Sequence, residues 1–257
     1  MGVVYRSVDP CTQRPVALKT LQRDLLNGPA TEEFATRLRV EGEVARRLAH
    51  PGIVAVREYG EAWPYTYIAM EYVDGRSLKA CLDEGVVFSL SRTVAIMVQL
   101  LEALQHAHEH GVWHRDVKPS NLLLTREDRV KLADFGIARM KSPALARLGV
   151  IMGTPGYIAP ETYLSETCDQ RVDVFGAGAV LYLLLAGVPP FVGAAHEIML
   201  KVCYETPRPP SVVACSSFVQ PLDAVVMRAL ARNPAERFAS AAQFRAALLQ
   251  AHGSLAR

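Results

Sequence analysis

The sequence lacks any block rich in lysine or arginine, and its charges nearly balance. Lys plus Arg total 28 and Asp plus Glu total 26, so the formal net charge is +2. Because nucleic-acid binding usually needs a clear basic excess, we expect no nucleic-acid partner. Half of the residues are hydrophobic and 21% are charged, which is typical of a globular protein with a substantial core.

The sequence also lacks a CxxC pair, and its cysteines are few, odd in number and widely spaced. This argues against a disulfide framework or a zinc site and favours a reducing, cytoplasmic compartment. The five cysteines are Cys11, Cys81, Cys168, Cys203 and Cys215.

No apolar run is long enough to cross a membrane. The longest uncharged segment, 174–188, is shorter than the roughly 20 residues that a span needs, and Pro189 ends it. We therefore expect a helix that is buried on all sides. The first residues, 1–6, lack the basic start and apolar core of a signal peptide.

The chain changes from a strand-rich part to a helix-rich part near residues 71–75, where we place a hinge. Strands are predicted at 3–8, 16–21, 53–59, 65–72, 122–124 and 130–132. Helices are predicted at 31–49, 91–110, 173–186, 194–204, 219–231 and 240–251. This order predicts an α+β protein with a cleft between two parts.

Three motifs follow one another in the second half of the chain. Residues 114–121 read His-Arg-Asp-Val-Lys-Pro-Ser-Asn, residues 134–136 read Asp-Phe-Gly, and residues 159–161 read Ala-Pro-Glu. Upstream, residues 16–19 read Val-Ala-Leu-Lys. Each motif alone is weak, but in this order they resemble the protein kinase superfamily, in particular bacterial serine/threonine kinases.

The resemblance implies a two-lobed kinase fold. The small β-rich N-lobe would span 1–73 and include helix C at 31–49, the mainly helical C-lobe would span 74–252, and a tail would follow at 253–257. The implied reaction transfers the γ-phosphoryl group of ATP to serine or threonine hydroxyls of proteins. Lys118, two residues after Asp116, marks serine/threonine rather than tyrosine kinases in this family.

The residue types suit phosphoryl transfer, in which catalysis consists mostly of positioning and charge neutralisation. Asp134 and Asn121 offer oxygen ligands for Mg²⁺, or Mn²⁺ in its place. Asp116 can accept the proton of the attacking hydroxyl, and Lys118 can place a positive charge beside the transferring group. Lys19 would hold the α- and β-phosphates.

Lys19 needs a carboxylate that fixes its ammonium group. Glu41 is favoured because it lies nine residues before His50, where the helix-C glutamate of the family usually falls. Glu43 is the alternative. The two lie about 200° apart on a helix, so only one of them can face the cleft.

The resemblance also assigns the adenine site and the loops around it. Its apolar walls would be Val4, Ala17 and Leu123, its gatekeeper Met70, and its hinge hydrogen bonds would come from the backbone of Glu71 and Val73. In the substrate-docking loop 153–161, Thr154 would bond Asp116 and Lys118, and Glu161 would pair with Arg237. Asp173 would anchor the His-Arg-Asp loop.

Two segments depart from the family pattern. Of the Gly-rich loop only Gly2 and the following Val-Val-Tyr are present, so we expect Met1 to be an internal methionine with the first strand missing upstream. If the chain starts here, weak ATP affinity and poor stability are expected. Between Asp134 and Gly153 the only hydroxyl residue is Ser142, so we expect activity that is independent of phosphorylation in this loop.

Three other interpretations are weighed. A pseudokinase scaffold fits the incomplete Gly-rich loop, but Lys19, Asp116, Asn121 and Asp134 are all present, which argues against it. A small-molecule phosphotransferase of kinase-like fold typically lacks the docking loop. The histidines 106, 108 and 110 invite a metal interpretation, but they fit better as the polar end of a helix, where histidine suits the C-terminal dipole.

Overall fold

The computed structural model describes residues 3–22, 43, 45–62, 65–135, 154–164 and 166–255 of the chain. The predicted helix at 31–49 therefore lies mostly outside the described residues; within it, residues 43 and 45 are helical. Gly2 and Glu41 also lie outside the described residues.

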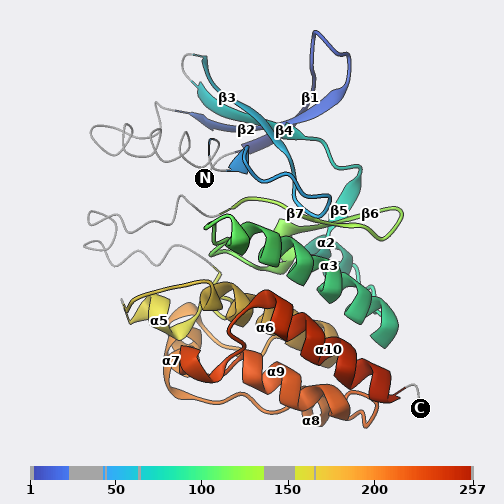
Figure 1. The fold of residues 1–257 in the computed structure, drawn as a ribbon, viewed down its shortest axis with the longest axis vertical. Helices are drawn as coiled ribbons and strands as arrows, with labels where there is room; N and C mark the ends of the chain where they lie inside the picture. Colours follow the sequence, from blue (N-terminus) through green and yellow to red (C-terminus); the bar gives the residue numbers. More distant parts are fainter. Residues whose placement is uncertain are drawn as a thin grey trace.

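An antiparallel sheet forms the upper half of the molecule (Figure 1). Its strands are β1 (Val3–Val8), β2 (Pro15–Gln22), β3 (Val56–Ala62) and β4 (Tyr65–Glu71), in the order β1-β2-β4-β3. The alternation of β-branched and aromatic residues with polar ones explains why these segments form strands. All four strands predicted for this half are present.

The third of these strands was predicted to start too early. It begins at Val56, whereas Ile53 forms an isolated parallel bridge with Leu132 of β7 (Val130–Leu132). The N–H of Val54 donates to the Leu132 carbonyl at 3.0 Å, and the Leu132 N–H donates to the Gly52 carbonyl at 2.8 Å. Tertiary pairing therefore draws these residues away from the upper sheet.

A small second sheet lies between the upper sheet and the helices (Figure 1). It has the order β5-β6-β7, where β5 is Gly75–Ser77 and β6 is Leu122–Thr125. The predicted strands at 122–124 and 130–132 are confirmed. β5 was not predicted, because three residues carry no readable alternation.

The lower half is helical. The predicted helices are found as α3 (Leu90–Glu109), α6 (Arg171–Ala186), α7 (Ala195–Tyr204), α9 (Asp223–Ala229) and α10 (Ala241–Leu255). The predicted helix at 219–231 is shorter, because a 3-10 turn, η4 (Gln220–Leu222), contains Pro221 and precedes α9. Short elements were missed: α2 (Leu78–Asp83), α5 (Pro160–Tyr163), α8 (Pro210–Ala214), η2 (Pro119–Asn121) and η5 (Pro234–Glu236).

The main core lies between α3, α6 and α10, the long helices of the lower half (Figure 1). Leu100, Leu104, Phe175 and Leu181 are completely buried. α6 is buried on nearly all sides, as its uncharged sequence predicted. None of the helices in the described ranges has the length and apolar character that crossing a membrane requires.

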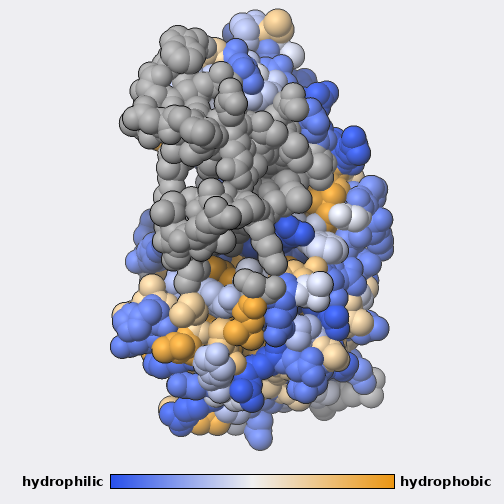
Figure 2. Space-filling model, turned by 90° about the vertical axis from the view of Figure 1, so that its left-hand side faces the viewer, coloured by the Kyte–Doolittle hydropathy of each residue, from blue (hydrophilic) through white to orange (hydrophobic). Residues whose placement is uncertain are grey.

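Hydrophobic surface is confined to small patches on the face shown in Figure 2, and these lie mainly over the helical half. Exposed apolar side chains of this half include Leu164 of the segment after α5 and Leu200 and Tyr204 of α7.

The packing of α6 against α9 generates a stability prediction. A Cβ at Gly178 would lie 2.8 Å from the Ala229 Cβ, a distance that real Cβ atoms essentially never show. We expect Gly178→Ala to lower the free energy of unfolding by about 1–3 kcal/mol, because overpacking forces the helices apart. Urea denaturation measures the change.

The matched control is Gly253→Ala in α10. Apart from the adjacent residues and the backbone of its own helix, no atom of the described residues lies within 4 Å of a Cβ at Gly253, so this variant should be neutral or stabilised by up to about 1 kcal/mol through helix propensity. Equal stability of the two variants would contradict the packing described here.

Candidate active site

The His-Arg-Asp loop is fixed by a buried carboxylate at the start of α6. Asp173 Oδ2 accepts a hydrogen bond from the His114 N–H at 2.8 Å, and Oδ1 accepts one from the Arg115 N–H at 2.6 Å. Asp173 Oδ2 also lies 2.8 Å from His108 Nε2 of α3. The predicted anchoring role of Asp173 is therefore confirmed.

His114 is completely buried below the site, and its partners suit the neutral ring. The Asp116 N–H donates to His114 Nδ1 at 3.2 Å, while Nε2 lies 2.9 Å from the Ala133 carbonyl, to which its N–H donates. Burial lowers the pKa of His114 below its usual value, in agreement with this pattern. The ring packs against Phe135, with centroids 4.7 Å apart.

The residues expected to carry the transfer chemistry converge just above this loop. Lys118 Nζ lies 2.8 Å from Asp116 Oδ2. Asn121 Nδ2 donates to the Asp116 carbonyl at 2.9 Å and to Asp116 Oδ2 at 3.2 Å. The turn η2, which starts at Pro119, brings Asn121 back toward Asp116. Because the side-chain nitrogen of Asn121 donates to Asp116, the side-chain oxygen Oδ1 is the atom of Asn121 that can bind a metal.

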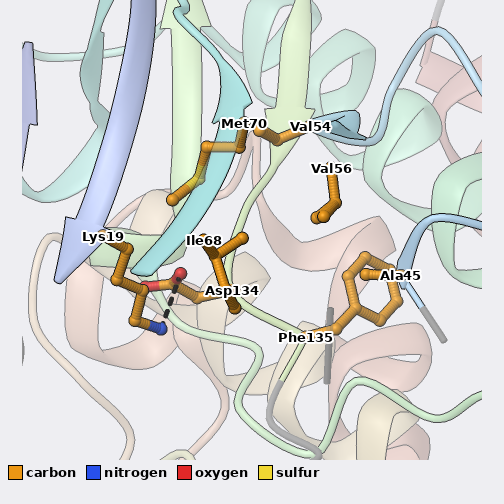
Figure 3. A pocket seen from close by; sticks show the side chains of 8 residues that line it. All are labelled: Lys19, Ala45, Val54, Val56, Ile68, Met70, Asp134 and Phe135. Atoms are coloured by element: carbon orange, nitrogen blue, oxygen red, sulfur yellow. Dashed lines mark hydrogen bonds and ion pairs between the residues drawn. The ribbon is translucent and has the colours of Figure 1, made fainter. Parts of the chain in front are cut away.

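Lys19 and Asp134 meet across the cleft between the two halves. Lys19 Nζ of β2 lies 3.0 Å from Asp134 Oδ1, as Figure 3 shows. Asp134 adopts a left-handed backbone with φ of 59°, a strained conformation for a residue other than glycine. Such strain persists only where surrounding structure enforces it.

A pocket extends from this ion pair into the upper half (Figure 3). Among the residues that the structure describes, its lining is apolar apart from the Lys19 and Asp134 side chains. The lining residues are Lys19, Ala45, Val54, Val56, Ile68, Met70, Asp134 and Phe135.

The residues expected around adenine are placed as follows. Ala17 and Met70 are paired on neighbouring strands β2 and β4, and Leu123 lies half-buried in β6. Val4 is more exposed, at 56%. These positions do not test whether Val4, Ala17 and Leu123 contact adenine, so the assignment stays a prediction.

One backbone donor of the hinge is already in use. The Glu71 N–H donates to the Ala55 carbonyl at 2.8 Å, so a bond from Glu71 to adenine would have to use its carbonyl. Within the described ranges, the backbone of Val73 makes no hydrogen bond, and both of its polar groups remain open to a ligand.

The expected bonds of Thr154 are absent in this conformation. Thr154 is exposed, and within the part of the chain that the structure describes its side chain makes no hydrogen bond with Asp116 or Lys118. The expected pair of Glu161 with Arg237 is confirmed: both are buried, and two hydrogen bonds of 2.7 and 2.8 Å join them.

Two supporting residues were missed from the sequence. His108, interpreted as part of a polar helix end, is buried and contacts Asp173, and its position four residues after the buried Leu104 was the available signal. Lys131 of β7 pairs with both carboxylate oxygens of Glu71 at 2.8 Å and so joins the hinge to the small second sheet. No sequence signal indicated that pair.

The donor set fits a nucleotide-bound divalent ion better than a protein-held metal. Asn121 and Asp134 supply hard oxygen atoms, and Lys19 supplies a cation for phosphate. Among the described residues, no three His, Cys, Asp or Glu side chains gather as a metal site. An ion here would take its other ligands from phosphates and water.

The comparisons with known proteins agree with this geometry. The model of the protein kinase domain family matches residues 1–248, so the chain belongs to that family. The chain is 39% identical over 98% of its length to the serine/threonine-protein kinase PknB of Mycolicibacterium smegmatis, and 38% identical over 98% to PknB of Mycobacterium tuberculosis. It is 38% identical over 95% to a probable serine/threonine-protein kinase of Streptomyces coelicolor. It spans only 41% of the length of the two PknB relatives and 37% of the third.

The neutral His114 ring generates a pH prediction. In the unfolded chain a histidine takes up a proton near pH 6.5, whereas the folded ring resists protonation because burial lowers its pKa. The free energy of unfolding should therefore fall as the pH is lowered below about 6.5, by at most about 1.4 kcal/mol per unit.

His114→Phe keeps an aromatic ring against Phe135 and removes the titrating group. Its unfolding free energy should be lower at neutral pH but should change less between pH 7 and pH 5.5. His50, whose pKa is also lowered by burial, is present in both proteins, so the difference isolates His114. Parallel pH profiles would show that His114 is not held neutral.

Proposed function

We propose that this chain transfers the γ-phosphoryl group of ATP to serine or threonine hydroxyls of proteins. The observation that carries the proposal is a pair of neighbouring polar clusters: Asp116 Oδ2 lies 2.8 Å from Lys118 and 3.2 Å from Asn121, and Lys19 lies 3.0 Å from Asp134. The N–H of Ala133, directly before Asp134, donates to the Asn121 carbonyl at 2.8 Å and so holds the two clusters together. Polar residues of β2, of the His-Arg-Asp loop and of the segment after β7 are thus brought together where a packed core would exclude them.

Lys19, Asn121 and Asp134 form the nucleotide-binding part of the proposed site. Asn121 and Asp134 would hold Mg²⁺, or Mn²⁺ in its place, which neutralises phosphate charge when bound. Lys19, now 3.0 Å from Asp134, would then contact the phosphates. Glu41, outside the described residues, is proposed to position Lys19.

Gly2 and the adenine-site residues complete the proposed nucleotide contacts. Adenine would lie against Val4, Ala17 and Leu123 and would bond the hinge backbone at Glu71 and Val73. The two open backbone groups of Val73 support this arrangement.

Asp116 is the proposed acceptor of the hydroxyl proton. Asn121 Nδ2, 3.2 Å from Asp116 Oδ2, holds the carboxylate in one orientation. The Lys118 ammonium, 2.8 Å from the same oxygen, places positive charge where the transferring group would pass. The Lys118 and Asp116 side chains are both largely shielded from solvent, which strengthens the attraction between their charges.

A protein substrate is proposed on the strength of the segment after residue 153 and of the relatives' names. The Ala-Pro-Glu end of this segment is fixed by the buried pair of Glu161 and Arg237. Thr154 lies exposed at its start, where it could reach Asp116 in a substrate-bound state. A cytoplasmic location is also proposed, supported by the free cysteine thiols.

Replacement of Asp116 tests the activity. Asp116→Asn keeps the shape and should lower the rate of transfer from labelled ATP and Mg²⁺ to a basic protein by about 10²- to 10⁴-fold, because the proton acceptor is lost. ATP binding, measured by a thermal shift, should persist. Asp128→Asn removes another carboxylate, 54% exposed and paired with Arg92, and should change neither measurement.

The same assay decides between a kinase and a pseudokinase scaffold. A wild-type chain that binds ATP but transfers no phosphate faster than Asp116→Asn would contradict the proposal. Neither the geometry of the site nor the comparisons favour the scaffold.

A further inference from the structure

Arg115, the middle residue of the His-Arg-Asp motif, packs on a tryptophan. Its guanidinium carbon lies 5.0 Å from the centroid of the Trp113 ring, within the range of a cation–π interaction. Both residues are half-buried, and partial removal from water strengthens this kind of contact.

The backbone of Arg115 is held in a conformation that it would not adopt by itself. Its φ is 61°, in the left-handed region, which is costly for an arginine. Its N–H is held by Asp173 at 2.6 Å from one side. The contact of the Arg115 side chain with Trp113 fixes this residue, which directly precedes Asp116, at a second point.

The sequence offers few phosphorylation sites that could hold the Arg115 side chain instead. An arginine at this position can be held by a phosphorylated residue, because phosphate accepts several charge-assisted hydrogen bonds. Between Asp134 and Gly153 only Ser142 could carry a phosphate. The indole ring offers an attraction for the guanidinium that needs no phosphorylation.

We propose that Trp113 is a positioning residue for phosphoryl transfer: it holds Arg115, and through it Asp116, without phosphorylation of segment 134–153. The inference rests on the kinase activity proposed above. It predicts an effect on turnover rather than on ATP affinity, because Trp113 acts through the residue before the proton acceptor.

Three substitutions separate this role from simple packing. Trp113→Leu removes the aromatic face and should lower kcat by about 2- to 30-fold, the range that a cation–π interaction covers, with an unchanged KM for ATP. Trp113→Phe keeps an aromatic face and should lose less. Phe88→Leu removes another such contact, that of Arg92 at 4.8 Å at the opposite end of α3, and should leave kcat unchanged.

A double-mutant cycle tests whether Trp113 works through Arg115. In an Arg115→Met background, Trp113→Leu should cause no further loss of kcat. Ser142→Ala and phosphatase treatment should both leave the wild-type kcat unchanged. An unchanged kcat in Trp113→Leu, an equal loss in the Arg115→Met background, or a large loss in Ser142→Ala would each overturn the inference.

A measurement that does not need activity separates failure of this inference from failure of the proposed function. In arginine-labelled protein, NMR should show the Arg115 Nε–H signal moved by the ring current of Trp113 and restored in Trp113→Leu. Absence of that shift overturns the contact even in an active kinase. A wild-type chain that shows the shift but no Asp116-dependent transfer contradicts the proposed function and leaves the contact standing.

Discussion

The carboxylate of Asp173 joins the core of the helical half to the site. It is 1% exposed, and an isolated ionised carboxylate at such a depth would cost several kcal/mol. Three partners offset this cost: the N–H groups of His114 and Arg115 and the ring of His108. Its place in the first turn of α6 adds the favourable end of the helix dipole. The loop that carries Asp116 therefore cannot shift without leaving a buried charge unsatisfied.

Two of the five described residues other than glycine with positive φ lie beside this anchor. Arg115 and Asp134 both have left-handed backbones, and the neutral ring of His114, the residue before Arg115, packs against Phe135, the residue after Asp134. The other three are Gln13, between β1 and β2, Asp128, between β6 and β7, and Cys215, at the end of α8. A well-packed core below the site thus supports two costly conformations that orient the polar groups above it.

Sequence reasoning predicted the larger elements, because their apolar residues recur with a regular period and glycine or proline marks their ends. The uncharged segment 174–188 predicted the burial of α6, and the resemblance to protein kinases predicted that Lys19, Asp116, Asn121 and Asp134 would gather around one nucleotide. The attachment of residues 52–54 to β7 was not predictable, since it depends on pairing with residues about 80 positions away. The burial of His108, the link of Glu71 to Lys131 and the stacking of Trp113 on Arg115 likewise depend on tertiary placement alone.

A crystal structure with a non-hydrolysable ATP analogue and Mg²⁺ tests the central claim most directly, namely that the anchored loop and the Lys19–Asp134 pair form one nucleotide site. The account predicts that Lys19 contacts the phosphates, that the metal binds oxygen atoms of Asn121 and Asp134, and that the three hydrogen-bond contacts of Asp173 are retained. A nucleotide bound elsewhere, or a metal that contacts neither Asn121 nor Asp134, would contradict it.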